Sequence, residues 1–547
     1  MDTLAVVPIV FNAGAAVLPA VLAGLVSVVA IVFRPKQWGP AIRQYPSAFG
    51  GGAALLLLLI GAWWLRPTDA PLATTIRRGS PQAGSVAGAT DWTAIGLAYL
   101  RERDAGSAVI APSDPRSTAN ESPTIFRGNP LRNGHDGGPS PVGLVPAWSY
   151  TDPEDDTALY LSSVAVRWPY VYATSATLVP PNSSGSVLCL DALTGTRRWL
   201  TYEATPPGGD EAATFKGFFS SPAITADGKF LVVGQGLHQD RDSALLCFDA
   251  ATGALRWQVP TKLHIESSPA IEGDIVVVGA GAVEIGDDHK PAPGDDPGFV
   301  MGVRISDGKL LWKVAVNDPE SSPAIADGIA YIGSGVNGNE VVAIRIADYD
   351  AEADKARLPR VAWRTKTPYP AIGAVTVAGD LVLIGTGRGD FAYGDPNPAG
   401  VVLALDKATG TVRWQADMPD AVLGPVAVQG TRAIVPVRNG EVVAIDLDAK
   451  GKILWRQRIT DTAPVLAGTA FTGTHVYAVS SDGTLAVLDA TDGKIIERHP
   501  INRPGKPGEL SFSISAPMIS NGLVIVGSET GGIQAFGTKA GVAGGRQ

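Results

Sequence analysis

Several residue types are scarce in this chain, and their scarcity excludes several kinds of protein. The 547 residues include two cysteines and six histidines, with no Cys-x-x-Cys pair and no zinc-finger spacing. These counts argue against a disulfide framework, a c-type haem and a structural zinc site. There is also no basic run, and the net charge is −9. An acidic chain of this kind is a poor partner for nucleic acid.

Charged residues are absent from two long stretches near the start of the chain. Thr3–Phe33 and Ser47–Leu65 are uncharged and apolar. As helices, both are long enough to cross a hydrocarbon core of about 30 Å. The sequence therefore predicts a two-helix membrane anchor over residues 1–66, with helices at about 4–33 and 47–65.

The loop between the two apolar runs predicts their orientation. It carries Arg34, Lys36 and Arg43 and no acidic residue. The positive-inside rule places such a loop in the cytoplasm. The N-terminus and everything after Leu65 are then periplasmic, and the protein is expected in the inner (cytoplasmic) membrane. A cleaved signal peptide is the alternative, but the first run is long and lacks a basic start.

Residues 67–123 have the composition of a linker, being rich in Pro, Ser, Ala and Gly. Within them, a short helix is expected at about 91–103, with a broad apolar side. That helix either lies on the membrane or a partner, or packs against the following domain.

One ten-residue phrase recurs along the rest of the chain. It reads LDALTGTRRW at Leu190–Trp199, FDAATGALRW at Phe248–Trp257 and LDKATGTVRW at Leu405–Trp414. The Asp and the Thr-Gly pair between two apolar runs predict a hairpin, because Gly takes the positive φ of a tight turn. A second phrase precedes it, as in SSPAITADGKFLVVG at Ser220–Gly234. Each repeat is therefore four short strands.

The spacing and the two ends of the repeat region predict the architecture. The closing Trp recurs about every 50 residues, which is typical of a β-propeller. Trp148 lies on a strand with no preceding strands of its own, and Ser515–Gly537 supplies three strands with no Trp strand after them. Joining these pieces closes one blade from both ends and leaves no free sheet edge.

The prediction is an all-β, eight-bladed propeller over residues 124–538, with a flexible tail at 539–547. Large amphipathic rings on the outer strands are expected to fill the gap to the next blade. These docking residues are Trp148, Trp199, Trp257, Trp312, Trp363, Trp414 and Trp455.

The repeat resembles that of the pyrroloquinoline-quinone (PQQ) type of propeller, and FRGNPLRNG at Phe126–Gly134 resembles the opening segment of bacterial members. This family includes quinone-dependent dehydrogenases and cofactor-free scaffolds. One such scaffold is a propeller lipoprotein of outer-membrane protein assembly. No cysteine lies near the N-terminus here, so two predicted helices stand in place of that lipid anchor.

The resemblance also implies what a quinone site requires. Quinone-dependent members stack PQQ on a Trp near the axis and bind Ca²⁺, and many carry two adjacent cysteines. In this chain Cys189 and Cys247 lie in different repeats, where they are expected to be buried free thiols. Trp168 is the only Trp outside the docking set, the anchor and the linker. We therefore expect no cofactor, with PQQ and calcium as the alternative.

The residue before each Ser-Ser-Pro-Ala motif is expected to lie at the channel mouth, in a ring of eight. The ring predicted from the repeats is Leu161, Phe219, Glu266, Glu320, Ala371, Val422, Asp461 and Ile514. Glu266, Glu320 and Asp461, with Lys216 and His264 close in sequence, are candidate ligands for a cation or a basic peptide. A solvated rim that binds nothing is the alternative.

Two insertions provide a second candidate. Asp287, Asp288, Asp295 and Asp296 lie in the insertion Glu284–Gly298 and are candidate Ca²⁺ ligands, although a mobile connector has the same composition. The insertion Asp390–Gly400 falls at the same point of a later repeat. Both insertions decorate one face, which is a plausible docking surface.

The sequence therefore predicts a membrane-anchored periplasmic propeller that acts as a non-enzymatic protein-binding scaffold or as an accessory subunit of a membrane complex. A PQQ-dependent oxidoreductase, or a degenerate relative, is the first alternative. A sensor whose channel binds a small ligand is the second.

Overall fold

The computed structural model describes residues 126–129, 131–179, 182–282, 296–350, 357–503 and 510–538. The predicted anchor helices at 4–33 and 47–65 and the predicted helix at 91–103 lie outside these ranges. Within the described ranges, no helix has the length and apolar character needed to cross a membrane.

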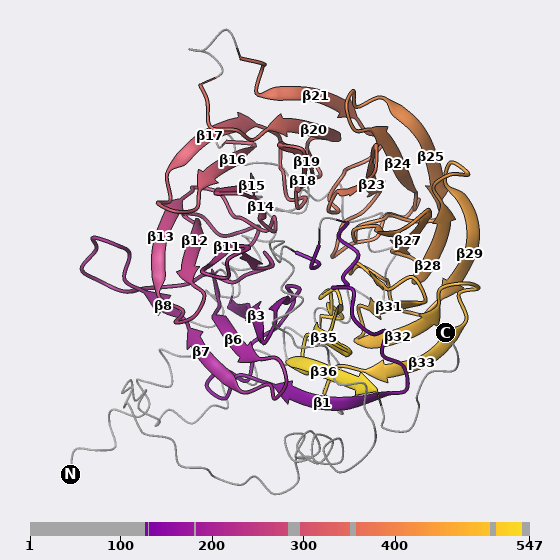
Figure 1. The fold of residues 1–547 in the computed structure, drawn as a ribbon, viewed down its shortest axis with the longest axis horizontal. Helices are drawn as coiled ribbons and strands as arrows, with labels where there is room; N and C mark the ends of the chain where they lie inside the picture. Colours follow the sequence, from indigo (N-terminus) through magenta and orange to yellow (C-terminus); the bar gives the residue numbers. More distant parts are fainter. Residues whose placement is uncertain are drawn as a thin grey trace, which may run out of the picture. The chain divides into compact units, whose positions relative to one another are not determined.

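The described residues form eight four-stranded antiparallel sheets around a common axis, which confirms the predicted eight-bladed propeller (Figure 1). Blade 1 contains β2 (Ala165–Arg167), β3 (Tyr170–Thr174), β6 (Val187–Asp191) and β7 (Arg197–Thr201). Blade 2 contains β10 (Ala223–Ile224), β11 (Phe230–Gly234), β12 (Ala244–Asp249) and β13 (Leu255–Pro260). Blade 3 contains β14 (Ala270–Glu272), β15 (Ile275–Gly281), β16 (Gly298–Arg304) and β17 (Leu310–Ala315). Blade 4 contains β18 (Ala324–Ala326), β19 (Ile329–Gly333), β20 (Glu340–Arg345) and β21 (Val361–Lys366).

The remaining blades follow the same order from the axis outwards. Blade 5 contains β22 (Thr376–Ala378), β23 (Leu381–Gly387), β24 (Gly400–Asp406) and β25 (Val412–Met418). Blade 6 contains β26 (Ala427–Gln429), β27 (Arg432–Val437), β28 (Glu441–Asp446) and β29 (Lys452–Arg458). Blade 7 contains β30 (Ala470–Phe471), β31 (His475–Ser480), β32 (Thr484–Asp489) and β33 (Ile495–Pro500). Two small hairpins are added, β4 (Thr177–Val179) with β5 (Asn182–Ser184), and β8 (Glu203–Ala204) with β9 (Ala213–Thr214).

Blade 8 joins the two ends of the repeat region. Its inner strands are β34 (Met518–Ser520), β35 (Leu523–Gly527) and β36 (Ile533–Thr538), and its outer strand is β1 (Leu144–Tyr150). The strand order is β1-β36-β35-β34, with Trp148 paired to Ala535. The ring is thus closed by main-chain hydrogen bonds between its ends, which leaves no open sheet edge at this seam.

The burial pattern explains why the third and fourth strands of a blade differ in sequence. In β12 (ALLCFD) five consecutive residues are buried, because both faces of the strand pack against neighbouring blades. In β13 (LRWQVP) burial alternates, so Trp257 and Val259 face inwards while Arg256 and Gln258 are exposed. Period-two alternation is the expected pattern of a half-buried strand.

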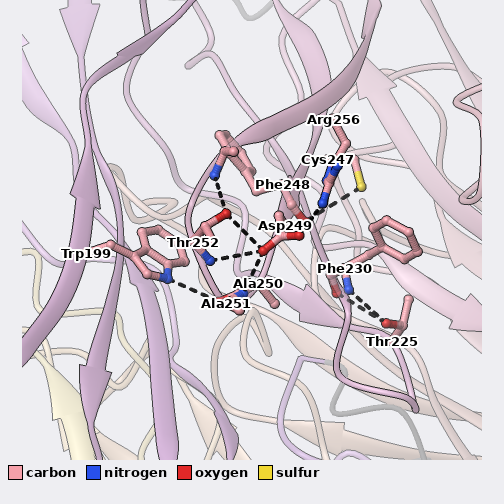
Figure 2. A network of polar contacts seen from close by, with 11 residues as sticks. Trp199, Thr225, Phe230, Cys247, Phe248, Asp249, Ala250, Ala251, Thr252 and Arg256 are labelled. Atoms are coloured by element: carbon pink, nitrogen blue, oxygen red, sulfur yellow. Dashed lines mark hydrogen bonds and ion pairs between the residues drawn. The ribbon is translucent and has the colours of Figure 1, made fainter.

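The recurring Asp organises the turn between these two strands (Figure 2). Asp249 accepts hydrogen bonds from the backbone and the hydroxyl of Thr252, and its carboxylate pairs with Arg256. A β-bulge between Cys247 and Phe248 shifts the register, which leaves Arg256 as the extra residue opposite the bend. The Asp-x-x-Thr-Gly pattern is therefore a turn-forming device.

The tryptophans of the outer strands connect each blade to the next. Trp199 donates its ring N–H to the carbonyl of Ala250, as Figure 2 shows, and Trp257 does the same to Ile305. Trp148, Trp312, Trp363 and Trp455 donate to Ala192, Ile346, Lys407 and Ala490. Trp414 lies against Gly451 of the following blade.

The turn glycine lies directly under the docked ring. At Gly308, whose φ is +70°, an added Cβ would lie 2.7 Å from Cγ of Trp257. Blade 4 has no glycine at this place, and the guanidinium of Arg360 lies 5.1 Å from the ring centre of Trp312. A cation–π contact thus replaces the close glycine contact there.

Blade 7 closes on Glu497 where the other blades have Trp. The carboxylate of Glu497 accepts hydrogen bonds from the backbone N–H groups of Gly143 (2.7 Å) and Leu144 (2.9 Å) at the start of β1. Nε2 of His499 lies 2.8 Å from the same carboxylate. A charged acceptor therefore joins blade 7 to the closing blade.

Candidate functional site

A cavity of about 320 Å³ lies at the centre of the ring, with lining residues from all eight blades. Each blade contributes the residue that lies four positions before the start of its innermost strand, the strand nearest the axis. This ring consists of Leu161, Phe219, Glu266, Glu320, Ile372, Leu423, Leu466 and Ile514. Six members are apolar, and the two glutamates are neighbours.

The observed ring differs from the predicted one at three blades. Ser321 donates its hydroxyl to the carbonyl of Gly373, as Ser267 does to Ser321, so Gly373 is the equivalent of the first serine. The ring residue of blade 5 is therefore Ile372, and the prediction of Ala371 is wrong by one residue. In the same way Leu423 takes the place predicted for Val422. An error of one residue in the predicted register names the neighbouring side chain in place of the one that faces the axis.

Blade 7 shows a larger error. Ala470 pairs with Tyr477 as Ala324 pairs with Tyr331, which places Leu466 in the ring. The predicted ring residue, Asp461, lies in an exposed bend outside the cavity lining. Thr462–Pro464 resembles the Ser-Ser-Pro motif but lies too far before β30, which explains why Asp461 was predicted in place of Leu466.

Loops between second and third strands contribute the mouth of the cavity. They supply Leu178, Leu237, Val336 and Phe391 to the lining. Phe512, from the segment before β34, also lines it and lies 6.0 Å from Phe219, ring centre to ring centre. The insertion expected at Asp390–Gly400 thus reaches the cavity through Phe391. The other insertion lies mostly outside the described residues.

The segment before β1 also reaches the cavity. Phe126 is part of the lining, and Nη1 of Arg127 donates to the carbonyl of Pro425, another lining residue, at 2.9 Å. In Figure 1 the indigo chain before β1 runs in towards the axis. Arg127 and Arg132 are both buried, and burial lowers the pKa of each guanidinium to about 9.

One side of the otherwise apolar wall carries two histidines and two glutamates. Nδ1 of His238 lies 2.9 Å from Oε1 of Glu320, and Nε2 of His264 lies 3.3 Å from the same oxygen. Nε2 of His238 is 3.6 Å from Oε2 of Glu266, whose Oε1 accepts the backbone N–H of His238 at 3.0 Å. The two imidazole rings meet edge to face, with centres 5.2 Å apart.

The two carboxyl groups differ in acidity because their surroundings differ. Burial would raise the pKa of Glu320, but the positive charge and hydrogen bonds of His238 and His264 hold it well below its usual range. Burial raises the pKa of Glu266, and the nearby Glu320 carboxylate adds to that rise. The carboxyl group of Glu320 is therefore the more acidic of the two.

The structure brings together three of the predicted candidates and separates the others. Glu266, Glu320 and His264 form one cluster. Lys216 instead hydrogen-bonds the backbone carbonyl of Arg241. Asp296 accepts the backbone N–H of Gly298 at 3.0 Å, and the other three candidate calcium ligands, Asp287, Asp288 and Asp295, lie outside the described residues. Ligand binding by any of these residues stays a prediction.

His238 is the member that the sequence did not reveal. It lies in the loop after β11, distant in sequence from the ring residues that it contacts. The only available signal was its position between second and third strands, the same place from which the two insertions project.

Comparison with known proteins agrees with this architecture. A family model described as outer membrane protein assembly factor BamB matches residues 143–283, 183–350 and 398–543. The chain belongs to this family. The BamB protein of Yersinia pestis is 24% identical over 234 residues, which is 38% of this chain and 53% of that protein. The BamB protein of Nitrosomonas eutropha is 30% identical over 174 residues, or 31% of this chain and 39% of that protein. The chain thus spans about half the length, or less, of these relatives.

Solved structures show the same fold at low sequence identity. BamB from Moraxella catarrhalis superposes with a TM-score of 0.51 at 16% identity, covering 72% of this chain and 99% of that chain. Quinohemoprotein alcohol dehydrogenase from Comamonas testosteroni gives 0.54 at 15% identity, covering 84% and 86%. A europium-containing methanol dehydrogenase gives 0.55 at 13% identity, covering 78% and 100%. The BamB structure and the two dehydrogenase structures are about equally similar in fold, so the likeness in fold does not distinguish between them.

The cavity residues do not fit a PQQ cofactor. PQQ is a planar tricarboxylate, and holding it requires cationic donors for its carboxylates. The described residues that line the cavity include Glu266, Glu320 and Asp390, but no lysine, arginine or tryptophan. Trp168, the one Trp outside the docking set, the anchor and the linker, instead packs against a hydrophobic cluster between blades 1 and 8. Carboxylates in a lining that itself contains no lysine or arginine would repel a trianion.

Proposed function

We propose that this chain is a non-catalytic propeller scaffold that holds a protein partner at the mouth of its central cavity, within a complex of the bacterial envelope. The observation that carries the proposal is the lining of the cavity. Phe219, Phe391 and Phe512 surround a concave apolar site on the face built by the inter-strand loops. Such a site suits an apolar side chain of a protein segment better than a charged metabolite.

The family supports a role in assembling envelope proteins. The relatives that match are outer membrane protein assembly factors. We extend to this chain the role of an accessory subunit on the periplasmic side of the membrane. The two apolar runs at Thr3–Phe33 and Ser47–Leu65 would then anchor it in the cytoplasmic membrane.

Affinity purification tests the proposal. The full-length protein is isolated from native membranes in a mild detergent, and the eluate is examined by mass spectrometry and by absorbance. The proposal expects at least one envelope protein in stoichiometric amount and no quinone absorbance. A protein that elutes alone with a bound quinone chromophore would overturn it and favour the alternative, a PQQ-dependent oxidoreductase.

A variant pair links that result to the cavity. Phe391→Ala removes an aromatic ring from the lining, whereas Tyr393→Ala removes a ring that is 67% exposed on the same loop. The partner should be lost or strongly reduced with Phe391→Ala and retained with Tyr393→Ala. Equal recovery with both variants would place the partner elsewhere on the molecule.

A further inference from the structure

The geometry points to a metal site for Zn²⁺ or a chemically similar ion, formed by His238, His264 and Glu320 at the wall of the central cavity. Each of these residues presents one ligand atom, and the three atoms lie within 4.8 Å of one another. The residues come from the loop after β11 and from the segments before β14 and β18, so the propeller fold itself brings them together.

The distances within the cluster are close to those of a metal centre. Two ligands held at about 2.0–2.1 Å from a tetrahedral ion are themselves about 3.3 Å apart. The two nitrogens lie 2.9 Å (His238 Nδ1) and 3.3 Å (His264 Nε2) from Oε1 of Glu320. Small side-chain adjustments are therefore enough to admit an ion between them.

Glu266 lies where such sites place an outer carboxylate. A histidine that binds a metal through one ring nitrogen usually donates its other N–H to a carboxylate or carbonyl, which fixes the tautomer and the ring orientation. Nδ1 of His238 faces Glu320, while its Nε2 lies 3.6 Å from Oε2 of Glu266. The backbone N–H of His238 also binds Glu266, which anchors the loop at the correct place.

Burial and charge give a reason for a cation at this place. The side chains of His264, Glu320 and Glu266 are 0%, 7% and 12% exposed. Two carboxyl groups are thus drawn into an apolar wall, where His238 and His264 are the only basic side chains among the described residues beside them and the described lining contains no lysine or arginine. A divalent cation compensates this charge directly.

The ligand types select the class of ion. Two imidazole nitrogens and one carboxylate oxygen suit Zn²⁺ and the neighbouring transition metals, whereas Ca²⁺ and Mg²⁺ prefer sets made of oxygen atoms. Three protein ligands leave one coordination position, and Glu320 and His238 are both part of the cavity lining. The site stands independently of the proposed scaffold function, since it needs only the residues of this chain.

Zinc binding to the purified full-length protein tests the inference. The protein is prepared in mild detergent with an affinity tag that contains no histidine, stripped with a chelator and titrated with Zn²⁺ against a chromophoric competitor. One Zn²⁺ per chain should bind, and Ca²⁺ should not compete. His238→Gln and Glu320→Gln should each weaken Zn²⁺ affinity by more than about tenfold, because loss of even an outer-shell partner typically costs that much.

A histidine outside the cluster provides the control. His475 contacts Thr474 and lies away from the four residues of the cluster, so His475→Gln should leave the Zn²⁺ affinity unchanged. The melting temperature should rise with Zn²⁺ in the wild type and in His475→Gln but not in His238→Gln. Because the side chain of His238 is partly exposed, its replacement should not disturb folding, and misfolding would not explain the loss of the Zn²⁺ effect. No Zn²⁺ binding, or binding unaffected by either cluster variant, would show that the four residues form only an ion-pair network.

Discussion

Glu320 lies within hydrogen-bond distance of His238 and His264, which reach it from different segments of the chain. The same Oε1 atom is 2.9 Å from Nδ1 of His238 and 3.3 Å from Nε2 of His264. This convergence depends on the propeller ring, because only the ring places the loop of one blade beside the inner segments of the next two. The fold and the site are therefore coupled, and the first predictions concern what holds the ring together.

Gly308→Ala should destabilise the propeller more than Gly328→Ala. Both glycines have a positive φ, +70° and +73°, so alanine is strained by about 1 kcal/mol or more at either place. At Gly328 an added Cβ would have no atom within 4 Å beyond its own chain neighbours, whereas at Gly308 the added Cβ would meet the ring of Trp257. The clash should add about 1–3 kcal/mol.

Urea unfolding of the two variants checks this prediction. The difference between them isolates the docking of blade 2 on blade 3, since the backbone strain is shared. Equal unfolding midpoints would mean that the Trp–Gly contact contributes little to the ring.

Glu497→Ala should weaken the contact between blade 7 and the closing blade 8. It leaves the backbone N–H groups of Gly143 and Leu144 without the carboxylate that accepts them. Loss of a charged acceptor of this kind costs about 2–3 kcal/mol. Glu272→Ala, at an exposed strand end, is the matched control and should change stability by less than about 0.5 kcal/mol.

The thermal midpoints of these two variants provide the measurement. If Glu497→Ala melts together with Glu272→Ala, the contacts of β1 with β36 alone are sufficient to close the ring.

Asp406 should stabilise the fold in a pH-dependent manner. The hydrogen bond from Arg413 lowers the pKa of Asp406 to about 2, from an ordinary value of 3.8, and hydrogen bonds from Thr409 add to the effect. A carboxyl whose pKa is lower in the folded state stabilises that state above its unfolded pKa, and the contribution disappears as pH falls towards 2. Asp406→Asn should therefore be less stable than the wild type at pH 7, and the difference should shrink below about pH 4.

Urea unfolding of both proteins at pH 7, 4 and 3 measures the difference. A difference that stays constant over this range would mean that the carboxylate charge is not what stabilises the turn.

Cys189 and Cys247 should resist thiol reagents in the native protein. Both are buried free thiols, and burial raises the pKa of Cys189 to about 12 and raises that of Cys247 as well. The reactive thiolate is therefore scarce at pH 8. A chromogenic disulfide reagent should label neither cysteine in the folded state and two per chain after denaturation. Rapid labelling of the folded protein would show that the inner strands open readily.

Much of the fold could be predicted from the sequence because the residues that form the turns and dock the blades recur in the repeats. Asp249, Thr252 and Gly253 are turn formers, Trp257 is a docking residue, and their recurrence gives the number of blades. The unpaired Trp148 strand at one end and the three strands at the other predicted the seam in blade 8. Trp455 and Glu497 were also placed correctly as the last outer-strand positions, although the acceptor role of Glu497 was not foreseen.

The site could be predicted only in part, for two physical reasons. Where Ser-Ser-Pro gives way to Gly-Ala or Gly-Pro, the motif that marks the ring residue is lost and only the spacing to the following hairpin turn fixes the register, and Ile372 and Leu423 were each missed by one residue. His238 was missed because its contacts are made across blades, and residue spacing along one chain does not reveal which loop reaches the axis. Glu266, Glu320 and His264 were found because they adjoin the repeated motif.

The most direct test of the scaffold proposal is photo-crosslinking from the cavity mouth in living cells. A photoreactive amino acid is placed at Phe391, which lines the cavity, and in a second strain at Ile496, which is 47% exposed on the outer strand β33. The proposal predicts that position 391 crosslinks in high yield to the envelope protein that co-purifies with the chain, and that position 496 does not. Absence of a crosslink at position 391, with the partner still recovered on purification, would contradict the claim that the cavity holds it.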